Sequence, residues 1–312
     1  WECGARLYDT ADVYGHGRSE RLLGRLVGQV PREEIVLVSK VGYFRGTAEH
    51  GFHPGHMRRQ LEQTLDNLGT DRLDIYFLHH SDFGLDDRWL PAAAEAMHGF
   101  RQSGLVRAVG MRGPHRFAPD RLNLHRAERG DKLARFRAVF DRIRPDVLAV
   151  RDNLLTPADR SEGVFAFAAQ YRVGVLVNKP LAQGLLTGTY QPGQSRRFGP
   201  EDHRCRKRWF TPAATVVIAA GLAELRDILR AAPEQLIRVA LWACLDRYEH
   251  AIVLVGFTSP TQVRTNLTCL GTTPPRHVLD AARAIMADVQ RRLDAAGEVF
   301  LDERADLPEA AR

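Results

Sequence analysis

Residues 61–80 read LEQTLDNLGTDRLDIYFLHH and indicate the fold class of the chain. In the first part, leucines recur at positions 61, 65 and 68, which is the spacing of one helix face, and Gly69 then marks the end of that helix. The second part, Asp74–His79, is a short apolar and aromatic run of the kind found in buried strands. A helix followed at once by a buried strand predicts one unit of a parallel α/β sheet.

The same alternation extends along the chain in both directions. We expect strands at Arg6–Asp9, Ile35–Lys40, Asp74–His79, Val106–Gly110, Val147–Arg151, Gly174–Asn178 and Ile252–Gly256. We expect helices at Ser19–Gln29, His56–Leu68, Pro91–Ser103, Ser161–Tyr171, Pro233–Arg247, Pro260–Cys269 and Val278–Ala295. Two longer segments, Arg112–Pro145 and Tyr190–Ile228, are interpreted as insertions that shape access to a substrate site.

Strict alternation of strand and helix fits two architectures. No G-x-G-x-x-G follows the first strand, so a dinucleotide-binding doubly wound sheet lacks its fingerprint. The alternative is a (β/α)8 TIM barrel, which has eight strands where we count seven. Since the chain starts at Trp1, we expect the first strand and most of the first helix to be missing from it. Residues 1–312 are predicted to form a single barrel domain.

Composition excludes several classes of protein. With 44% hydrophobic and 26% charged residues in 312, the chain is of the globular type. The net charge, 44 − 38 = +6, is mild, and we expect the basic run Arg204–Arg208 to be a solvated loop that binds no nucleic acid. Four cysteines without C-x-x-C spacing predict neither a disulfide framework nor a zinc site. No apolar run reaches about 18 residues and no signal peptide is recognised, so we expect a cytoplasmic protein that does not bind membranes. The oligomeric state is left open.

Polar side chains stand where three of the predicted strands end. Asp9, Lys40 and His79 close strands, and Tyr14 lies in the loop after the first one. In a barrel these strand ends meet at one face. A phenol with a pKa near ~10 donates a proton poorly at neutral pH, and we expect the Lys40 ammonium to lower that pKa. A carboxylate would hold the lysine, and a neutral imidazole would orient a substrate oxygen. Such a set suits protonation of a carbonyl oxygen while a hydride reaches its carbon.

Five segments carry a family resemblance. They are Leu7–Gly15 with Gly17–Glu20, Val38–Lys40, Leu68–His79, Pro180–Gly188 and Val255–Asn266. Together they resemble, in the same order, the motifs of the aldo-keto reductases. The resemblance runs from Trp1 to about Leu270, and residues 271–312 would form a C-terminal helix and tail.

This resemblance implies an NADPH-dependent carbonyl reductase that acts on a small aldehyde or ketone, or on the alcohol in the reverse direction. It implies the catalytic residues Asp9, Tyr14, Lys40 and His79, with Tyr14 as the acid. It implies NADP as the cofactor, with NAD as the alternative, and no metal. The implied cofactor contacts are Arg112, Asn178, Pro180, Leu181, Gln183, Leu186, Gly256, Thr258, Gln262 and Asn266.

The chain departs from the family pattern at the nicotinamide. The family's Ser-Asn after the fourth strand is replaced in Gly110–Gly113, its Gln by Ala149, and its aromatic ring by Asn178. Gly256 and Thr258 stand where many relatives carry a basic residue for the 2′-phosphate. These changes leave the choice between NADP and NAD open. They also motivate a redox-neutral lyase, dehydratase or epimerase as a second hypothesis, and a nucleotide-binding regulatory subunit as a third. The complete tetrad argues against the regulatory subunit.

Other polar residues receive structural interpretations. His50, His53 and His56 recur every three residues, but the intervening glycines and proline break any helix that would align them as metal ligands, so we expect a loop. Ser19 and Glu20 are interpreted as a helix cap. Of the adjacent His79 and His80, only one can face the barrel interior, and the motif favours His79.

Overall fold

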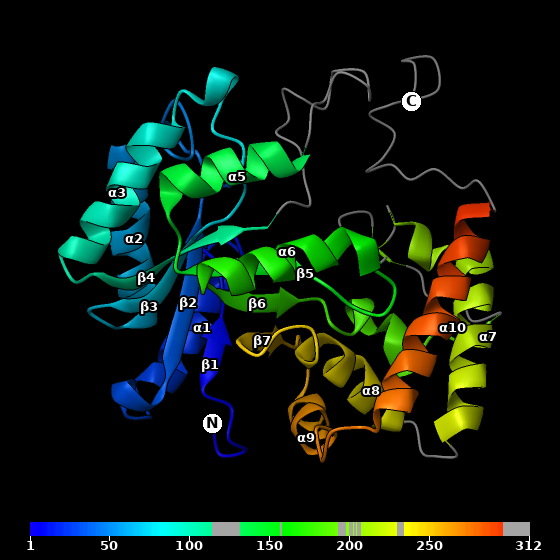
Figure 1. Ribbon diagram of the computed structural model, residues 1–312. Helices are drawn as coiled ribbons and strands as arrows, with labels where there is room; N and C mark the ends of the chain where they lie inside the picture. Colours follow the sequence, from blue (N-terminus) through cyan, green and yellow to red (C-terminus); the bar gives the residue numbers. More distant parts are fainter. Residues whose placement is uncertain are drawn as a thin grey trace. The chain divides into compact units, whose positions relative to one another are not determined.

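The computed structural model describes residues 1–113, 132–156, 158–192, 198–199, 202, 204, 207–229 and 234–295. In this part of the chain the strands follow one another in sheet order from β1 to β7, and the first five run parallel to their neighbours (Figure 1). The strands are β1 (Leu7–Asp9), β2 (Val36–Val41), β3 (Leu73–Leu78), β4 (Val106–Arg112), β5 (Val147–Arg151), β6 (Gly174–Asn178) and β7 (Ala251–Leu254). All seven predicted strands are confirmed.

Helices separate the strands. They are α1 (Arg18–Val27), α2 (Pro54–Leu68), α3 (Leu90–Gln102), α5 (Lys132–Ile143), α6 (Ala158–Tyr171), α7 (Pro212–Leu229), α8 (Glu234–Leu245), α9 (Pro260–Thr268) and α10 (Arg276–Ala295). The seven predicted helices are confirmed. No helix in the described ranges is both long and apolar enough to span a bilayer.

Both long segments contain a helix that was not predicted, because α5 and α7 lie in them, and their part in substrate access stays a prediction. In α5, Phe136, Val139, Phe140 and Ile143 are buried at helical spacing, a pattern that the sequence offered. The sequence of α7 is apolar almost all round, so no amphipathic period marked it. Residues 114–131 and the tail from 296 onward lie outside the described residues.

The chain divides into two compact units, each with its own core. Unit 1 comprises Trp1–Val150 with Tyr171–Val175, and unit 2 comprises Arg151–Gln170 with Leu176–Arg312. In unit 1, α2 and α3 pack against one another and against β2 and β4, respectively. Leu61 and Leu68 of α2 and Tyr76 and Phe77 of β3 are fully buried. The single-domain assignment stays a prediction.

Gly69 ends α2 as the sequence predicted. Its φ of 64° and ψ of 41° are left-handed, and its amide donates to the carbonyl oxygens of Leu65 and Asp66. An amino acid with a Cβ is strained in this conformation, so glycine is favoured here. The turn delivers the chain directly into β3.

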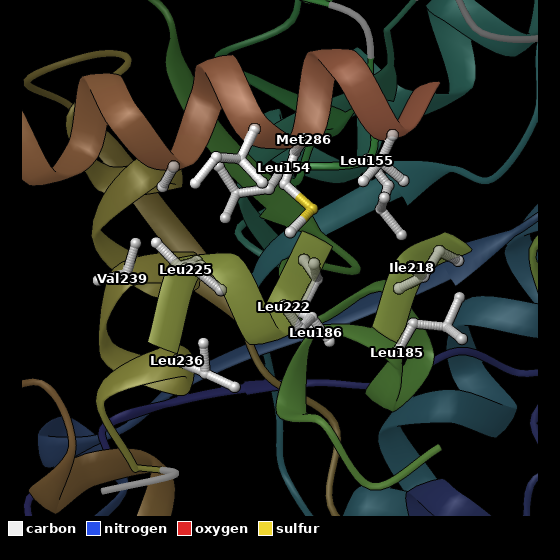
Figure 2. Packing of buried hydrophobic residues seen from close by; sticks show 14 of the residues in the cluster. Leu154, Leu155, Leu185, Leu186, Ile218, Leu222, Leu225, Leu236, Val239 and Met286 are labelled. Carbon is white, nitrogen blue, oxygen red and sulfur yellow. The ribbon is translucent and has the colours of Figure 1, made fainter. Parts of the chain in front are cut away.

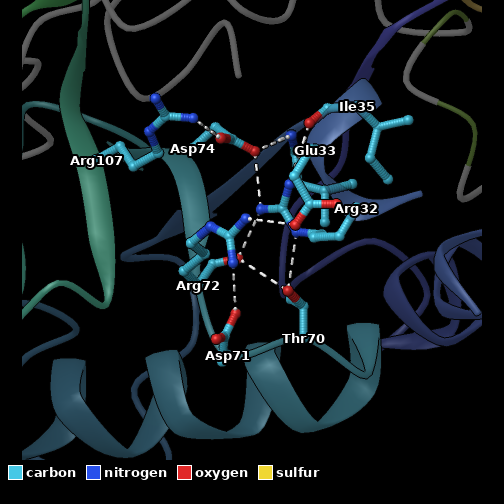
Figure 3. Close-up of polar contacts among 9 residues, drawn as sticks. Arg32, Glu33, Ile35, Thr70, Asp71, Arg72, Asp74 and Arg107 are labelled. Carbon is cyan, nitrogen blue, oxygen red and sulfur yellow. Dashed lines mark hydrogen bonds and ion pairs between the residues drawn. The ribbon is translucent and has the colours of Figure 1, made fainter.

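A buried ion-pair network joins the amino ends of β2, β3 and β4 (Figure 3). Asp74 Oδ2 accepts from Arg32 Nη2 at 2.8 Å and from the Leu37 amide at 2.9 Å. Asp74 Oδ1 accepts from Arg107 Nη1 at 3.2 Å. The Asp74 side chain is only 8% exposed, so these partners replace the water it loses on folding.

The core of unit 2 is a leucine-rich cluster between α7, α8 and α10 (Figure 2). Helices α7 and α10 lie along one another, and Leu222 and Met286 face each other across that contact. Leu154 and Leu155, which follow β5, and Leu185 and Leu186, which follow β6, complete the cluster. Unit 2 thus anchors the chain that leaves β5 and β6 in one apolar core.

Candidate active site

The loop from Thr10 to Gly17 connects β1 to α1 and is held by its own backbone. The Thr10 amide donates to Val38 O at 2.8 Å, the Tyr14 amide to Ala11 O at 3.0 Å, and the Gly17 amide to Asp12 O at 2.9 Å. Gly17 has a φ of 77°, and a Cβ there would lie 2.8 Å from Asn67 Nδ2. Tyr14 therefore stands on a tight turn that glycine makes possible.

Lys40 lies near the end of β2 and meets Asp9 at the end of β1. Its Nζ donates to Asp9 Oδ1 at 2.6 Å and to the carbonyl oxygen of Thr10 at 2.6 Å. Lys40 is 7% exposed. Burial lowers the pKa of Lys40, and the Asp9 carboxylate opposes that fall.

His79 directly follows β3 and is 7% exposed. Its amide donates to Val41 O at 2.8 Å. The ring of Tyr14 stands edge-on to the imidazole at 5.9 Å between centroids, and Lys40 Nζ lies 5.4 Å from the centre of the Tyr14 ring. The four predicted catalytic residues thus meet in unit 1. The ring of the adjacent His80 lies 4.6 Å from that of Phe52 and 4.8 Å from that of Tyr43.

The electrostatics of Tyr14 differ from the sequence expectation. Burial, together with the Asp9 carboxylate, raises the pKa of Tyr14 to about 12, and Arg112 opposes this rise. The expectation that Lys40 lowers that pKa below its usual value is wrong. Burial is the larger effect, and the Asp9 carboxylate, 2.6 Å from Lys40 Nζ, offsets part of the influence of the ammonium on the phenol. Because Tyr14 is 42% exposed, water screens part of the rise.

Arg112 and Tyr43 complete the surroundings of His79. Arg112 ends β4, and its Nη1 donates to His79 O at 3.2 Å and to Tyr43 Oη at 3.4 Å. The Tyr43 ring packs edge-on against His79 at 4.6 Å between centroids. No sequence pattern marked Tyr43, although it follows Lys40 by three residues, close to the end of β2. Arg112 therefore lies beside the tetrad in unit 1, whereas the other predicted cofactor residues belong to unit 2.

Two loops of unit 2 carry the other predicted cofactor residues. One follows β6 through Lys179–Gly188, and the other follows the neighbouring β7 through Gly256–Ser259. Gln183 and Gly184 have φ values of 58° and 95°, so the first loop turns sharply. Along these loops and α9, Gly256, Thr258 and Gln262 are exposed, and Asn178, Leu181, Gln183 and Asn266 are half-buried. Such polar, accessible groups at neighbouring strand ends fit a nucleotide.

The side chain of Leu186 is not placed to contact a bound cofactor. It is 1% exposed within the leucine-rich cluster, and its amide donates to Leu181 O at 3.3 Å. Pro180 is buried as well. These two residues shape the loop, and the family motif alone could not separate that role from a direct contact.

Ser19 and Glu20 do not cap α1, so that interpretation is wrong. The helix begins after Gly17 without a side-chain cap. Ser19 Oγ accepts from Thr10 Oγ1 at 2.8 Å. Glu20 is 1% exposed and accepts from Ser39 Oγ at 2.7 Å, Thr64 Oγ1 at 2.9 Å and Asn67 Nδ2 at 2.9 Å. Its three donors come from β2 and α2, which lie far along the chain from a local cap.

The three spaced histidines each have a local role. His50 Nδ1 accepts from the Phe52 amide at 3.1 Å, and its ring stacks on Trp89 at 6.1 Å. His56 Nε2 contacts Phe44 O at 2.9 Å, and His53 precedes α2. Among the residues that the structure describes, no three His, Cys, Asp or Glu side chains are grouped to hold a metal.

The strand ends bring together an ammonium, a phenol and an imidazole, groups that enzymes use to transfer a proton to or from a substrate. The chain belongs to the Aldo/keto reductase family, whose model matches residues 1–281. It is an oxidoreductase that interconverts carbonyl and alcohol groups of small molecules with a nicotinamide cofactor.

Known proteins support this assignment. The chain is 25% identical over 306 residues to the NADH-specific methylglyoxal reductase of Escherichia coli K12, covering 94% of this chain and 85% of that protein. It is 27% identical over 281 residues to the L-galactose dehydrogenase of Arabidopsis thaliana, covering 86% and 74%. The solved glycerol dehydrogenase of Gluconobacter oxydans superposes with a TM-score of 0.72 at 23% identity, covering 92% of this chain and 82% of that one. This likeness confirms the predicted (β/α)8 fold class.

Proposed function

We propose that Tyr14 is the general acid of a carbonyl reductase, with Lys40, Asp9 and His79 as its supporting residues. The observation that carries this proposal is the short Lys40–Asp9 pair beside the Tyr14 ring, with His79 packed edge-on to the same ring. Tyr14 is 42% exposed and keeps its proton at neutral pH, as an acid that donates to an incoming substrate must.

A nicotinamide cofactor, held by the residues after β6 and β7 described above, would supply a hydride to the carbonyl carbon. As the C=O π bond breaks, Tyr14 Oη transfers its proton to the carbonyl oxygen, so the product is an alcohol and the phenolate remains. Lys40 stabilises that phenolate, and Asp9 keeps the lysine charged. His79 orients the carbonyl oxygen toward Tyr14. In the reverse direction the phenolate accepts the proton of the alcohol.

Tyr14→Phe and Tyr43→Phe form a matched test. Both tyrosines are 42% exposed, and both rings stand edge-on to His79, but Lys40 Nζ contacts the ring of Tyr14. We expect Tyr14→Phe to reduce kcat by about 10²–10⁴-fold. We expect Tyr43→Phe to keep kcat within about tenfold. Oxidation of reduced nicotinamide with a panel of small aldehydes measures kcat, and fluorescence quenching measures cofactor binding.

Unchanged cofactor binding in both variants is required, because only then does the loss of turnover report the proton transfer. Turnover that survives Tyr14→Phe would remove Tyr14 from the acid's role. An equal loss in both variants would point to the packing around His79 in place of the acid.

We propose NADH as the preferred cofactor, in place of the NADP expected from the family pattern. Gly256, Thr258 and Gln262 carry no charge, and Gln262 Oε1 already accepts from the Thr258 amide at 2.6 Å. Arg264 is two residues from both Gln262 and Asn266, which places it on a different face of α9. The name of the Escherichia coli relative, an NADH-specific reductase, supports the same choice.

The ratio of kcat/KM with NADH to that with NADPH tests this choice. We expect a ratio above about ten, and a fall in the ratio with Gln262→Arg, because a guanidinium there would meet the 2′-phosphate. Arg264→Gln is the matched control and should leave the ratio unchanged. A wild-type preference for NADPH would overturn the proposal.

The substrate class follows from the relatives only as a proposal. Their names include methylglyoxal and L-galactose, so we propose small aldehydes, ketones and aldose sugars as the first panel. The cytoplasmic location expected from the sequence stays a prediction.

A further inference from the structure

Asp12 is a buried carboxyl group inside the loop that carries Tyr14. It is 4% exposed, and its backbone amide donates to Lys40 O at 3.5 Å. Within the described part of the chain, neither carboxyl oxygen of Asp12 has a hydrogen-bond partner. Buried carboxylates normally have partners, because an unpaired buried charge is costly. An exception so close to the reacting phenol calls for a functional explanation.

Glu20 provides a contrast within the same region. It is also buried, but three donors from β2 and α2 satisfy its carboxylate. The carboxyl oxygens of Glu20 therefore have hydrogen-bond partners, whereas Asp12 has no such set of donors. The hydroxyl of Tyr76, on β3, is likewise buried and unpartnered among the described residues.

Asp12 interacts electrostatically with four groups on four segments. They are Glu20 of α1, Lys40 of β2, Tyr76 of β3 and Tyr14 of its own loop. Glu20 is a like charge and favours the protonated form of Asp12. Lys40 favours the ionised form. Neither tyrosine is charged at neutral pH, because the pKa of each is raised by burial. One anion, Glu20, and one cation, Lys40, therefore have opposite effects on the ionisation of Asp12.

The balance of these effects favours a titration near neutrality. Burial raises the pKa of Asp12 to about 7, and the Glu20 carboxylate adds to the rise. The Val13 amide and the Lys40 ammonium oppose it, the amide without meeting the geometry of a hydrogen bond. Burial and the Asp9 carboxylate act most strongly on the pKa of Lys40 and of Tyr14, and ionised Asp12 adds a smaller upward shift to both.

We propose that Asp12 is a positioning residue that acts through Lys40 and Tyr14, and that its charge sets how firmly both hold their protons. The proposal rests on the role of Tyr14 proposed above. When Asp12 is protonated, Tyr14 gives up its proton more readily. When Asp12 ionises, the added negative charge strengthens the hold of Tyr14 on its proton, which slows reduction and raises the pH needed for alcohol oxidation.

Asp12→Asn tests the proposal, because the amide has the shape of the acid and no charge. With the wild-type holoenzyme, we expect kcat for reduction to fall through an ionisation near pH 7. In Asp12→Asn that ionisation disappears, so the ratio of variant to wild-type kcat rises about threefold or more between about pH 6 and about pH 9. The alkaline limb of alcohol oxidation moves to lower pH in the same variant.

Asp66→Asn is the matched control, since Asp66 is an exposed acid of α2 in the same unit, and its profile should follow the wild type. Asp12→Ser serves as the second uncharged variant if the asparagine variant does not fold. Titration of the Asp12 carboxyl carbon by NMR measures the ionisation directly.

A wild-type profile without an ionisation near pH 7, or one that persists in both Asp12 variants, would overturn this inference. Failure of the role proposed for Tyr14 can be told apart from failure of the role of Asp12, because only the former would leave turnover in Tyr14→Phe. Loss of turnover in Tyr14→Phe with an unchanged Asp12→Asn profile would remove the role of Asp12 alone.

Discussion

Lys40 makes two contacts of 2.6 Å, one with a side chain and one with a backbone carbonyl, and both partners belong to the chain around the end of β1. A compact ammonium on a flexible stem can satisfy both at once, whereas the planar fork of an arginine has a different geometry. The chain contains 44 Lys and Arg residues together, nearly all of them arginine, so a lysine at this position is a selective choice.

Lys40→Met should reduce kcat by about 10²-fold, because the methionine cannot stabilise the phenolate of Tyr14. It should also lower the free energy of unfolding by about 1–3 kcal/mol, because Asp9, 19% exposed, loses its partner. Steady-state kinetics and denaturant titration measure the two effects. A variant with kcat within threefold of wild type would contradict the role of Lys40.

The stability of the folded chain should also depend on Asp12. Its pKa is about 7 when folded and about 4 when unfolded, so between these values the folded state holds a proton that the unfolded state lacks. The contribution of Asp12 to stability is therefore most favourable below about pH 4 and falls as pH rises through about 7, by up to about 4 kcal/mol. Asp12→Asn should lack this fall, which denaturant titration of both proteins at several pH values measures.

At the scale of residues, the sequence predicted that the side chains of the candidate site lie together, but it did not predict the direction of their pKa shifts. Asp9, Lys40 and His79 could be found because they stand at strand ends, which converge in any parallel sheet. The environments of Asp12 and Glu20 could not be found, since they depend on how α1 and α2 pack behind the loop. The pKa of Tyr14 was predicted in the wrong direction because burial raises it and the Asp9 carboxylate adds to the rise.

At the scale of elements, the two ends of the sheet serve different purposes. The carboxyl ends carry the candidate site, and the amino ends of β2, β3 and β4 carry the Asp74 network (Figure 3). A barrel keeps its shape only if neighbouring strands keep their register. The Asp74 carboxylate on β3 accepts from the Leu37 amide on β2 and from Arg107 on β4, so it supports the register of all three strands.

Asp74→Ala should lower the free energy of unfolding by about 3–5 kcal/mol, because it leaves Arg32, 14% exposed at its side chain, without its carboxylate. The turnover of the fraction that remains folded should be unchanged. Asp71→Ala is the control: its side chain is 82% exposed, and its ion pair with Arg72 should contribute less than about 1 kcal/mol. Similar losses in both variants would contradict the importance of burial.

Helices and strands were predicted correctly where the periodicity of apolar residues in the sequence matches the face that is buried in the structure. The end of α2 at Gly69 was predicted because it needs a left-handed residue, and that need is local. Helix α7 was missed because its exposed face also carries apolar residues, among them Val216 and Ile228, so no polar stripe marks it in the sequence. Helix α5 was missed although its apolar spacing was present, because the segment was assigned as a whole to an insertion.

At the scale of the molecule, the tetrad and most of the predicted cofactor residues lie in different compact units. Each unit has a core of its own: aromatic and aliphatic side chains around β2 and β3 in unit 1, and the leucine-rich cluster in unit 2 (Figure 2). A destabilising substitution in one core should therefore first increase local unfolding of the unit that contains it.

Leu222→Ala tests this independence. Leu222 is 3% exposed within the leucine-rich cluster, so its truncation should lower stability by about 2–5 kcal/mol. Hydrogen exchange should accelerate first in α7, α8 and α10, with β2 and β3 of unit 1 less affected. Equal acceleration in both units would show that they unfold as one.

Glu20 has a consequence for how the substrate range of this chain can change. All three of its donors lie between Ser39 and Asn67, and it stands directly behind the turn of Tyr14. None of those donors comes from the long segments after β4 and β6. Mutation or loop grafting in those later segments therefore removes none of the three hydrogen bonds that hold Glu20. The support of the loop that carries Tyr14 is in this way independent of the two longest connections in the chain.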